Sequence, residues 1–238
     1  MSSPQPHLGT PVPGWTPPLP PGPSEIQGRL VCLERLDPAR HAADLHAANT
    51  ASDAIWDYLP YGPFADLADY RAWAEGIAGQ SDPFFYALCD PVTGRAGGVA
   101  SFLRISPAAG SIEVGHIALS PQMQRTPAAT EAMVLMMGWA FAAGYRRYEW
   151  KCDALNRPSR RAAERLGLSY EGTFRQAAVI KGRNRDTAWF AAIDSEWPRL
   201  SAAFAHWLAP GNFDAAGRQR QSLSALTAPV LVMRDPAL

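Results

Sequence analysis

The pattern of hydrophobic and polar positions predicts a chain that switches repeatedly between strands and helices. Short apolar or alternating runs bounded by Gly, Pro and Asp predict strands. These runs are residues 30–36, 84–89, 97–105, 112–119, 145–152, 168–174 and 187–193. Apolar residues three or four positions apart predict helices at residues 38–48, 66–78, 128–142, 159–166 and 196–208. This order predicts an α/β fold with a mixed sheet and flanking helices.

The two ends of the chain lack this periodicity. Residues 1–28 contain nine of the 22 prolines, a composition typical of an extended arm that is either disordered or laid across the folded domain. Residues 209–238 contain one apolar patch, at 230–233, and no other readable element. We therefore expect an arm at residues 1–28, one folded domain at 29–208 and a tail at 209–238.

Composition excludes several classes of protein. The net charge of zero argues against a dedicated nucleic-acid or membrane-surface binder. The charges are nevertheless unevenly placed, because residues 37–90 contain nine acidic and two basic side chains and residues 146–185 contain eleven basic and four acidic ones. This asymmetry indicates either two solvated faces of opposite sign or a site with an anion-binding half and a cation-attracting half.

The cysteines and the apolar runs bear on location. Cys32, Cys89 and Cys152 are odd in number, far apart and set in apolar runs, which fits reduced, buried thiols. Their spacing does not match a zinc site, so we expect no metal ion. Outside the Pro-rich N-terminal segment, the uncharged apolar run at residues 132–145 has the length of a buried helix. We expect a soluble cytoplasmic protein.

Two successive strand-turn-helix units hold the candidate chemistry. The predicted strand 112–119 leads through the turn 121–127 into an apolar helix. The predicted strand 145–152 leads through Asn156-Arg157-Pro158-Ser159 into a short helix that ends in Leu166-Gly167. Each unit presents the N-terminal amides of a helix, and two such units together suit a ligand with several phosphates.

These units and the order of the elements resemble the GNAT acetyltransferases, most closely their RimJ/RimL-like branch. The resemblance covers roughly residues 29–196 and implies the GNAT acyl-CoA N-acyltransferase fold, with a predominantly antiparallel central sheet. It further implies an enzyme that transfers the acetyl group of acetyl-CoA to a primary amine by direct attack in a ternary complex. The amine could belong to a protein N-terminus or to a small molecule. The family often forms dimers, so a homodimer is a further expectation.

In the family, the turn after the third strand of the meander carries the motif Gln/Arg-x-x-Gly-x-Gly/Ala, whose amides bind the pyrophosphate of CoA. The matching residues here are Gln124, Arg125, Thr126, Ala128 and Ala129, and the hydroxyl of Thr130 could assist them. Pro127 replaces the central glycine and removes one N–H donor. Alternatively, Thr126 caps the helix and Pro127 begins it, and both interpretations can hold together.

The second unit matches the Asn-x-x-Ser segment of the RimJ/RimL-like enzymes. The resemblance implies that Asn156 contacts the pantetheine arm and that Ser159 lies near the CoA sulfur, where it could protonate the leaving thiolate. The alternative is that either residue merely caps a helix. Arg160 and Arg161 could reach the CoA phosphates, or could be ordinary surface arginines.

The resemblance also places the catalytic centre. In this fold the strand 112–119 diverges from the next strand, and the thioester enters the gap, so the backbone of Ile117, Ala118 and Leu119 would stabilise the oxyanion. Glu113 and His116 are the candidate general bases. We favour Glu113, because many family members carry a glutamate on this strand; His116 has the better unperturbed pKa. Glu149 is the third candidate.

For the acceptor amine, the resemblance points to Trp56, Tyr58 and Tyr61, together with the loop 181–186. Aspartates in the same aromatic loop, Asp53 and Asp57, would favour a cationic amine. The alternative is a surface loop with ordinary aromatic anchors. Two other functions stay open: a catalytically silent acyl-CoA-binding domain, suggested by Pro127, and transfer of a longer acyl group through the Met-rich helix 128–142, whose methionines are otherwise core residues.

Overall fold

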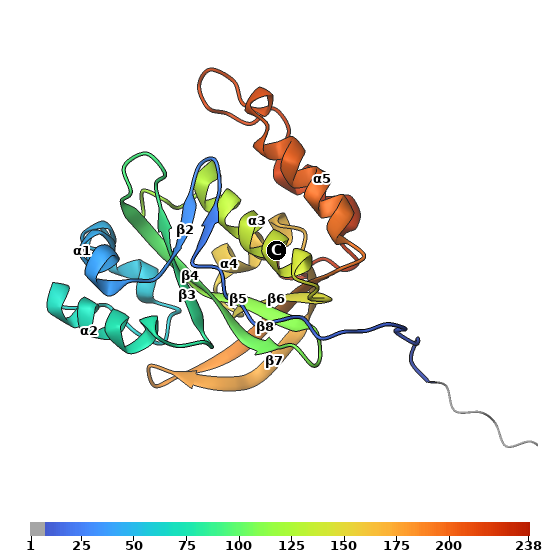
Figure 1. Cartoon of the computed structure of the whole chain (residues 1–238), viewed down its shortest axis with the longest axis horizontal. Coiled ribbons are helices and arrows are strands. Elements are labelled where there is room, and N and C mark those ends of the chain that lie inside the picture. Colours follow the sequence, from blue (N-terminus) through green and yellow to red (C-terminus); the bar gives the residue numbers. More distant parts are fainter. Residues whose placement is uncertain (1–7) are drawn as a thin grey trace, which may run out of the picture.

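The computed structural model describes residues 8–238, which form one eight-stranded sheet with helices on both faces (Figure 1). The strands are β1 (Glu25–Gln27), β2 (Cys32–Arg35), β3 (Phe84–Cys89), β4 (Ala96–Ser106), β5 (Ser111–Leu119), β6 (Arg147–Asp153), β7 (Ser169–Ile180) and β8 (Arg183–Ile193). Their order in the sheet is β1-β2-β3-β4-β5-β6-β8-β7. β5 and β6 run parallel and the other neighbours run antiparallel, which confirms the predicted mixed sheet.

The helices begin where polar caps and prolines place them. They are α1 (Pro38–Asn49), α2 (Leu67–Ala78), α3 (Pro127–Ala142), α4 (Arg157–Arg165), α5 (Trp197–Leu208) and α6 (Leu223–Thr227), with short 3₁₀ turns η1 (Asp53–Trp56), η2 (Pro210–Asn212) and η3 (Ala228–Val230). Side-chain oxygens of Asp37, Asp66, Thr126 and Asn156 accept hydrogen bonds from the first turns of α1 to α4. Each cap satisfies an amide that has no partner inside its helix.

Alternation along the strands divides the hydrophobic core into two layers. On β3, Phe85 and Ala87 pack with α1 and α2, whereas Tyr86 and Leu88 pack with α3 on the other face of the sheet. α3 is apolar nearly all round because it is covered by the sheet on one side and by α5 on the other (Figure 1). The two faces of the sheet are therefore covered by different helices, α1 and α2 on one face and α3 on the other.

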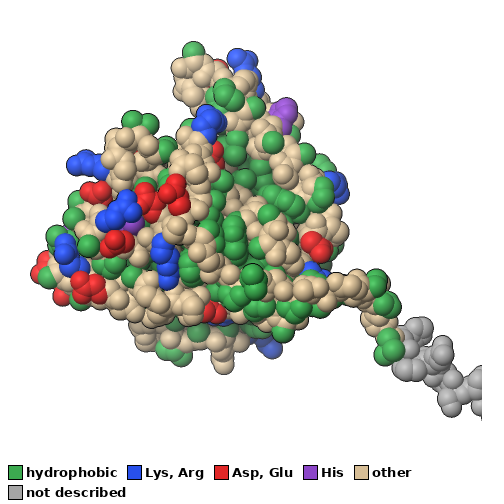
Figure 2. Space-filling view, viewed as in Figure 1, with side chains coloured by type: hydrophobic (Ala, Val, Ile, Leu, Met, Phe, Trp, Pro, Cys, Tyr) green, Lys and Arg blue, Asp and Glu red, His purple; other side chains and the backbone are tan. Residues whose placement is uncertain are grey.

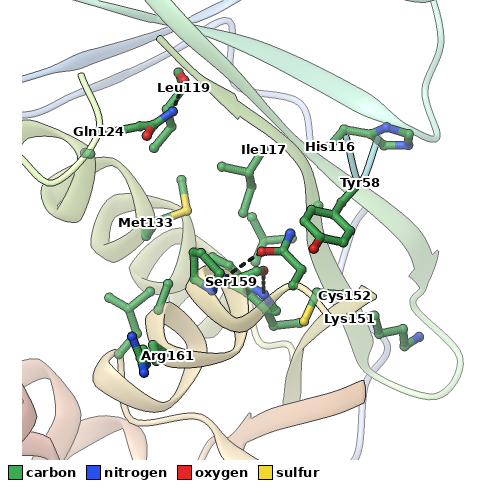
Figure 3. A pocket seen from close by; sticks show the side chains of 18 of the residues that line it. Tyr58, His116, Ile117, Leu119, Gln124, Met133, Lys151, Cys152, Ser159 and Arg161 are labelled. Atoms are coloured by element: carbon green, nitrogen blue, oxygen red, sulfur yellow. Dashed lines mark hydrogen bonds between the residues drawn. The ribbon is translucent and has the colours of Figure 1, made fainter. Parts of the chain in front are cut away.

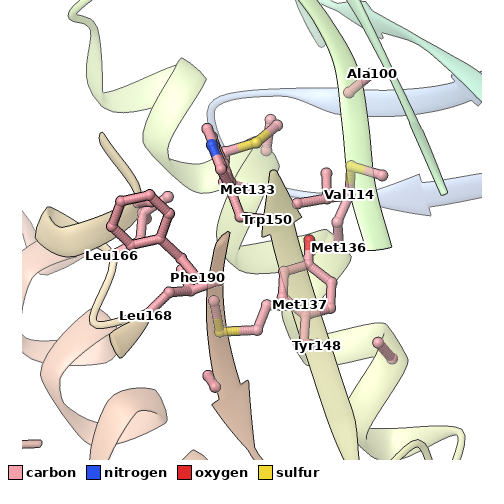
Figure 4. Packing of buried hydrophobic residues seen from close by; sticks show 14 of the residues in the cluster. Ala100, Val114, Met133, Met136, Met137, Tyr148, Trp150, Leu166, Leu168 and Phe190 are labelled. Carbon is pink, nitrogen blue, oxygen red and sulfur yellow. The ribbon is translucent and has the colours of Figure 1, made fainter. Parts of the chain in front are cut away.

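The methionines of α3 belong to the larger core layer. Met136 and Met137 are fully buried and lie close to Val114 and Tyr148 (Figure 4). They fill the space between the helix and the sheet, as flexible thioether side chains commonly do. The interpretation of these methionines as core residues is therefore confirmed.

The N-terminal segment is more ordered than its composition suggested. Residues 1–7 of the expected arm lie outside the described residues. The sheet begins at Glu25 rather than near residue 30, because Ile26 of β1 pairs with Leu33 of β2. Further upstream, the hydroxyl of Tyr145 donates to the carbonyl of Leu19 at 3.2 Å. Residues 15–27 of the arm thus lie against the domain, whereas residues 8–14 are exposed and lead away from it (Figure 1).

The hairpin of β7 and β8 is longer than predicted. Its strands continue to Ile180 and from Arg183, so the expected loop 181–186 is reduced to a turn at Lys181 and Gly182. Both turn residues have positive φ, +48° and +73°, which is the conformation of a two-residue hairpin turn. The polar sequence of residues 181–186 concealed the second strand.

Residues 209–238 also fold onto the domain. Leu223 of α6 and Val230 of η3 are buried in the larger core layer, which also contains Leu200 of α5. The N–H of Tyr170 on β7 donates to the carbonyl of Met233 at 3.1 Å. This C-terminal segment therefore packs against both α5 and the sheet, and no helix of residues 8–238 is long and apolar enough to cross a membrane.

Candidate active site

The site is built around a gap between β5 and β6. Their parallel pairing ends at Val114 and Trp150, and the two strands separate beyond these residues. Against β4, the stretch of β5 from Gly115 to Ala118 holds one extra residue, and His116 within it has φ +50°. Such a bulge bends its strand. The predicted divergence is confirmed, and beyond Val114 the edge of β5 towards β6 has no strand partner.

An open cleft of about 1540 Å³ runs through this gap. Its walls come from β5, α3, β6, α4, the β7–β8 hairpin and the loop after η1 (Figure 3). The predicted site residues that line it are Tyr58, Glu113, His116, Ile117, Leu119, Gln124, Arg125, Thr126, Ala129, Thr130, Asn156, Ser159 and Arg161. Five predicted residues do not line it: Trp56, Tyr61, Ala118, Ala128 and Arg160.

One end of the cleft is formed by the turn before α3. The Thr126 hydroxyl oxygen accepts a hydrogen bond from the Ala129 amide at 3.1 Å, and Pro127 begins the helix. Gln124 donates its side-chain N–H to the carbonyl of Leu119 at 2.9 Å, which fixes the turn on β5. Thr126 is therefore a helix cap, as one interpretation held. A helix N-terminus that opens into a cleft still attracts anions.

Three arginines line the same end: Arg125, Arg161 and Arg165. Arg165 was not predicted. Its guanidinium lies over the ring of Trp207, 4.9 Å from the centroid, and donates to the hydroxyl oxygen of Thr130 at 3.1 Å. Burial lowers the pKa of Arg165. Thr130 therefore orients a cation rather than standing free, and its place one helical turn from the N-terminus of α3 brings Arg165 to the predicted phosphate site.

Arg160 does not serve the cleft. Its Nε donates to Asp235 Oδ2 at 2.6 Å, and its Nη1 donates to the carbonyl of Ala154 at 2.6 Å. The residue is buried, and hydrogen bonding to Asp235 raises its pKa. The expectation that Arg160 binds a CoA phosphate is therefore wrong, because its donors are already used. Nothing in the local sequence pointed to a partner 75 residues away.

Asn156 acts as the helix cap, whereas Ser159 does not, so its hydroxyl is not used by the helix. Asn156 is the cap of α4, since its Oδ1 accepts from the Ser159 amide at 3.1 Å. The indole of Trp150 donates to the Ser159 oxygen at 3.0 Å, so Ser159 keeps its hydrogen as a donor, for which the Cys152 sulfur is one acceptor (Figure 3). Cys152 lies beside them, and burial raises the pKa of its thiol to about 11.

Glu113 and Glu149, two of the candidate bases, are held in ion pairs. Both oxygens of buried Glu113 accept from Arg104, at 2.9 and 2.8 Å, and Lys151 Nζ lies 2.9 Å from Glu113 and 2.7 Å from Glu149. Although burial raises the pKa of Glu149, hydrogen bonds from Arg147 and Lys151 hold it below its usual range. Lys151 also lies 3.6 Å from the ring centroid of Trp189. These partners stabilise the charged form of Glu149 and engage the oxygens of both carboxylates in contacts within the sheet.

His116 remains neutral in its pocket. Its Nδ1 lies 3.2 Å from the hydroxyl of Tyr61, and the two rings stack at 5.6 Å. Burial is the main cause that lowers the pKa of His116 to about 4, and the charges of Arg104 and Arg185 act in the same direction. The tautomer that Tyr61 stabilises decides which ring nitrogen accepts a proton.

The aromatic loop after η1 contributes less than expected. Tyr58 lines the cleft and donates its hydroxyl to the carbonyl of Leu155 at 3.3 Å. Trp56 is buried against Phe64 in the smaller core layer. Trp56 and Tyr61 are therefore corrected to positions behind the cleft wall, where Tyr61 supports His116. Asp53 and Asp57 are exposed outside the cleft.

One cluster away from the cleft has the composition of a metal site. Ligand atoms of Glu34, His41 and Cys89 lie within 4.8 Å of one another. Two of the three residues already have partners: Arg40 pairs with Glu34 at 2.6 Å, and the Asp37 amide donates to His41 Nδ1 at 3.0 Å. The contacts fasten the start of α1 to the sheet and give the cluster a structural role.

The charge asymmetry of the sequence also reappears in the structure. Acidic side chains gather over the α1 and α2 side, at the left of the view in Figure 2. The charged residues that line the cleft are mostly basic: Arg104, Arg125, Lys151, Arg161, Arg165 and Arg185, against Glu113 and Asp153. Basic side chains of residues 146–185 therefore line the cleft, whereas Asp53 and Asp57 of the acidic stretch stay outside it.

Comparison with known families identifies this architecture. The family model for the acetyltransferase (GNAT) domain matches residues 31–169. The chain therefore belongs to the GNAT acetyltransferase family, whose members use acetyl-CoA as cosubstrate. A comparison with curated proteins gives no match.

Solved structures agree with the family. A GCN5-related N-acetyltransferase from Brucella melitensis is 44% identical, with a TM-score of 0.88, and the match covers 91% of this chain and all of that chain (100%). A probable GNAT-family acetyltransferase from Chromobacterium violaceum is 41% identical, with a TM-score of 0.77 over 82% of this chain and 100% of that one. RimL, a ribosomal L7/L12 alpha-N-protein acetyltransferase, shares the fold at 22% identity, with a TM-score of 0.61 over 71% of this chain and 93% of its own.

Proposed function

We propose that this protein is an acetyl-CoA-dependent N-acetyltransferase of the RimJ/RimL-like kind that acetylates a primary amine by direct attack in a ternary complex. The observation that carries the proposal is the position of Ser159. Its hydroxyl keeps a hydrogen to donate, opens into the cleft and sits across the β5–β6 gap from Ile117 (Figure 3). Donors are thus present on both sides of the place where strand pairing has stopped.

The residues along the cleft fit acetyl-CoA. The N-terminus of α3, with Arg125, Arg161 and Arg165, supplies positive charge for phosphates. The stretch between these cations and the β5–β6 gap is lined by uncharged side chains, including Met133, Ala162 and Leu166, which suit the neutral pantetheine arm. Bound acetyl-CoA would supply the activated acetyl group.

The chain itself supplies orientation and hydrogen bonds. Backbone amides of β5 that face the gap can donate to the carbonyl oxygen on which negative charge develops. As the amine nitrogen bonds to the acyl carbon and the carbon–sulfur bond breaks, Ser159 can pass a proton to the departing sulfur. The nitrogen loses one proton in the same reaction, so amide and free thiol form without any net change in protons.

We assign His116 as the group that relays the proton lost by the nitrogen towards solvent, because a pKa of about 4 makes it too weak a base to keep that proton. It lines the cleft, it is neutral at physiological pH, and it is oriented by Tyr61. Glu113 has two cationic partners, so we propose that it holds β4, β5 and β6 together instead. This assignment reverses the preference drawn from the sequence, because the ion pairs could not be seen in it.

The silent acyl-CoA-binding alternative has less support. Pro127 removes one amide, but the same residue starts a well-capped helix whose other first-turn amides remain. The hydroxyl of Ser159 has no structural use as a cap, since Asn156 fills that role. Transfer of a longer acyl group also lacks support, because Met136 and Met137 are fully packed.

Release of free thiol from acetyl-CoA, measured over a panel of amines, tests the proposal. The panel contains peptide N-termini, polyamines, amino acids and aminoglycosides, and mass spectrometry identifies the acetylated nitrogen. We expect amine-dependent thiol release that Ser159→Ala slows. Tight binding of acetyl-CoA with no turnover on any amine would favour the silent alternative. Acetylation of a hydroxyl rather than a nitrogen would contradict the assignment of the acceptor.

A further inference from the structure

The cations of the cleft fall into two groups. Arg125, Arg161 and Arg165 lie at the α3 and α4 end. The second group lines the acceptor end, beside His116 and the β7–β8 hairpin, and consists of Arg104, Lys151 and Arg185. Lys151 is neutralised there by Glu113 and Glu149. Arg104 also pairs with Glu113, so the charge of Arg185 is the one that needs a separate explanation.

Arg185 is held in place but is not neutralised. Its Nε donates to the hydroxyl oxygen of Thr187 at 3.2 Å, which leaves the two terminal nitrogens of the guanidinium without a carboxylate among residues 8–238. The side chain is half-buried and lines the cleft. A positioned arginine with free terminal donors in a cleft has the form of an anion-binding group.

Arg185 lies on β8 two residues before Thr187, which pairs with Asp153 at the end of β6, where β5 and β6 are no longer paired. Burial is the main cause of the shifted pKa values of His116 and Cys152, and the charge of Arg185 acts on both groups. His116 belongs to β5 and Cys152 to β6, so the guanidinium lies within electrostatic range of both strands where they separate. Arg104 adds to this field: its Nη1 binds Glu113, while 61% of its side chain stays exposed.

Acetyl-CoA does not account for these cations. Its phosphates belong at the end of the cleft with the helix N-terminus and the other three arginines, whereas its pantetheine arm and thioester are uncharged. An uncompensated cation beside the thioester therefore faces the other substrate. A polyamine or another purely cationic acceptor would be repelled by Arg185 and Arg104 at this point.

We infer that the acceptor is a small amine that also carries an anionic group near the reactive nitrogen, a carboxylate or a phosphonate-like oxyanion, which binds Arg185 with help from Arg104. The inference rests on the proposed N-acetyltransferase function and adds the class of acceptor. It corrects the expectation of a cation-attracting pocket, since Asp53 and Asp57 lie outside the cleft.

The same cations would assist the chemistry. An amine must be neutral before it can attack, and nearby positive charge disfavours the ammonium form. Arg104 and Arg185 already contribute to lowering the pKa of His116, in the same part of the cleft. The pocket thus promotes loss of the ammonium proton to solvent before attack, which reduces the need for a strong general base.

Matched substrate pairs test the inference. Each pair consists of an amine with an anionic group and its counterpart in which that group is neutral. The first pair is an α-amino acid and its carboxamide, and the second is an aminoalkyl phosphonate and its diester. The third is a peptide with an acidic second residue and the same peptide with the corresponding amide side chain at that residue. The quantity measured is the ratio of kcat/KM for the anionic member to kcat/KM for the neutral one. The pairs also distinguish a carboxylate from a phosphonate, and a free amine from a peptide.

The wild-type ratio should exceed one for a small-molecule pair, and Arg185→Gln should lower it about 10- to 100-fold, mainly through KM, as expected for loss of a charge-assisted contact. Arg185→Lys should recover part of the loss. Arg183→Gln is the matched control, because Arg183 is an exposed arginine on the same strand that does not line the cleft. It should leave the ratio unchanged.

Failure of this inference is distinguishable from failure of the proposed function. Acetylation of neutral and anionic amines with equal efficiency, or a ratio that Arg185→Gln does not change, overturns the inference and leaves the N-acetyltransferase intact. A preference confined to the acidic peptide also overturns it. The absence of both acetyl-CoA binding and acetylation overturns the function itself. Binding of acetyl-CoA to Arg185→Gln, measured by titration, verifies that the variant is folded.

Discussion

The carboxylate of Asp235, near the end of the described chain, forms a two-point ion pair with the guanidinium of Arg160 on α4. Arg160 Nε donates to Asp235 Oδ2 at 2.6 Å, and Nη2 donates to Oδ1. The Asp235 amide in turn donates to Glu164 at 2.9 Å. The C-terminal segment therefore clamps α4 at two points, and α4 is the helix that begins next to Asn156 and carries Ser159. Residues beyond the matched GNAT region thus help to position the Ser159 hydroxyl.

Asp235→Ala should destabilise the protein by roughly 3 kcal/mol, because it leaves a buried arginine without its partner. It should also raise KM for acetyl-CoA, since α4 loses an anchor. Thermal unfolding and steady-state kinetics measure the two effects. The control is Asp214→Ala, which breaks the ion pair with Arg218, whose side chain is 80% exposed, and should have little effect. Equal effects of both variants would show that α4 does not depend on the clamp.

Ser159→Ala should lower kcat by roughly 10- to 100-fold if the hydroxyl protonates the departing sulfur. The helix should persist, because Asn156 supplies its cap. Acetyl-CoA affinity and circular dichroism should therefore change little. Ser159→Thr, which keeps a hydroxyl, should recover part of the rate. An unchanged kcat in Ser159→Ala would remove Ser159 from the chemistry.

Glu113→Gln distinguishes a structural carboxylate from a general base. The buried carboxylate pairs with Arg104 and Lys151, so its loss should lower the free energy of unfolding by roughly 3 kcal/mol. When kcat is measured well below the unfolding temperature, it should fall by much less than about 100-fold. A fully folded Glu113→Gln variant with kcat reduced more than about 100-fold would restore Glu113 as the base.

The low pKa of His116 predicts a specific dependence of stability on pH. Burial, assisted by Arg104 and Arg185, lowers the pKa to about 4 from an ordinary value of 6.5. Between these two pH values His116 is protonated in the unfolded chain but not in the folded chain. The free energy of unfolding therefore decreases as pH falls from about 6.5 to about 4. His116→Gln should flatten this part of the stability curve in urea unfolding. An identical curve in the variant would contradict the shifted pKa.

Removal of residues 1–23 should lower the melting temperature without abolishing acetyl-CoA binding. The truncation removes Trp15, whose ring lies 5.4 Å from the Arg146 guanidinium, and the carbonyls that accept from Tyr86 and Tyr145. The residues that line the cleft begin only at Ser52. Loss of binding by a truncated protein that is still folded would show that the arm reaches the site.

The sequence was sufficient for most of the fold because periodicity records burial. Phe84–Cys89 was predicted with its observed bounds, and α3 was recognised from its apolar run. The strands of the β7–β8 hairpin were predicted too short, because residues 175–180 are mostly exposed and therefore show no strong alternation of apolar and polar side chains. The C-terminal segment was unreadable because its helix, α6, is only five residues long and depends on contacts with α4 and α5.

The site was predictable where a motif fixes the backbone and unpredictable where distant side chains meet. The turn at Thr126 and the cap at Asn156 follow from local sequence. The partners of Glu113 and Arg160 come from other elements, so local spacing cannot reveal them. One signal was available: Glu149 and Lys151 alternate with the apolar residues of β6, which marks a charged face of the sheet.

The most direct test of the central claim is isothermal titration of the purified protein with acetyl-CoA and with desulfo-CoA. We expect a micromolar dissociation constant for acetyl-CoA, which Arg165→Gln weakens and Arg183→Gln leaves unchanged. Desulfo-CoA should also bind, because most of the contacts belong to the phosphates and the pantetheine arm. Failure of both ligands to bind the folded protein would contradict the assignment of the β5–β6 cleft as an acetyl-CoA site.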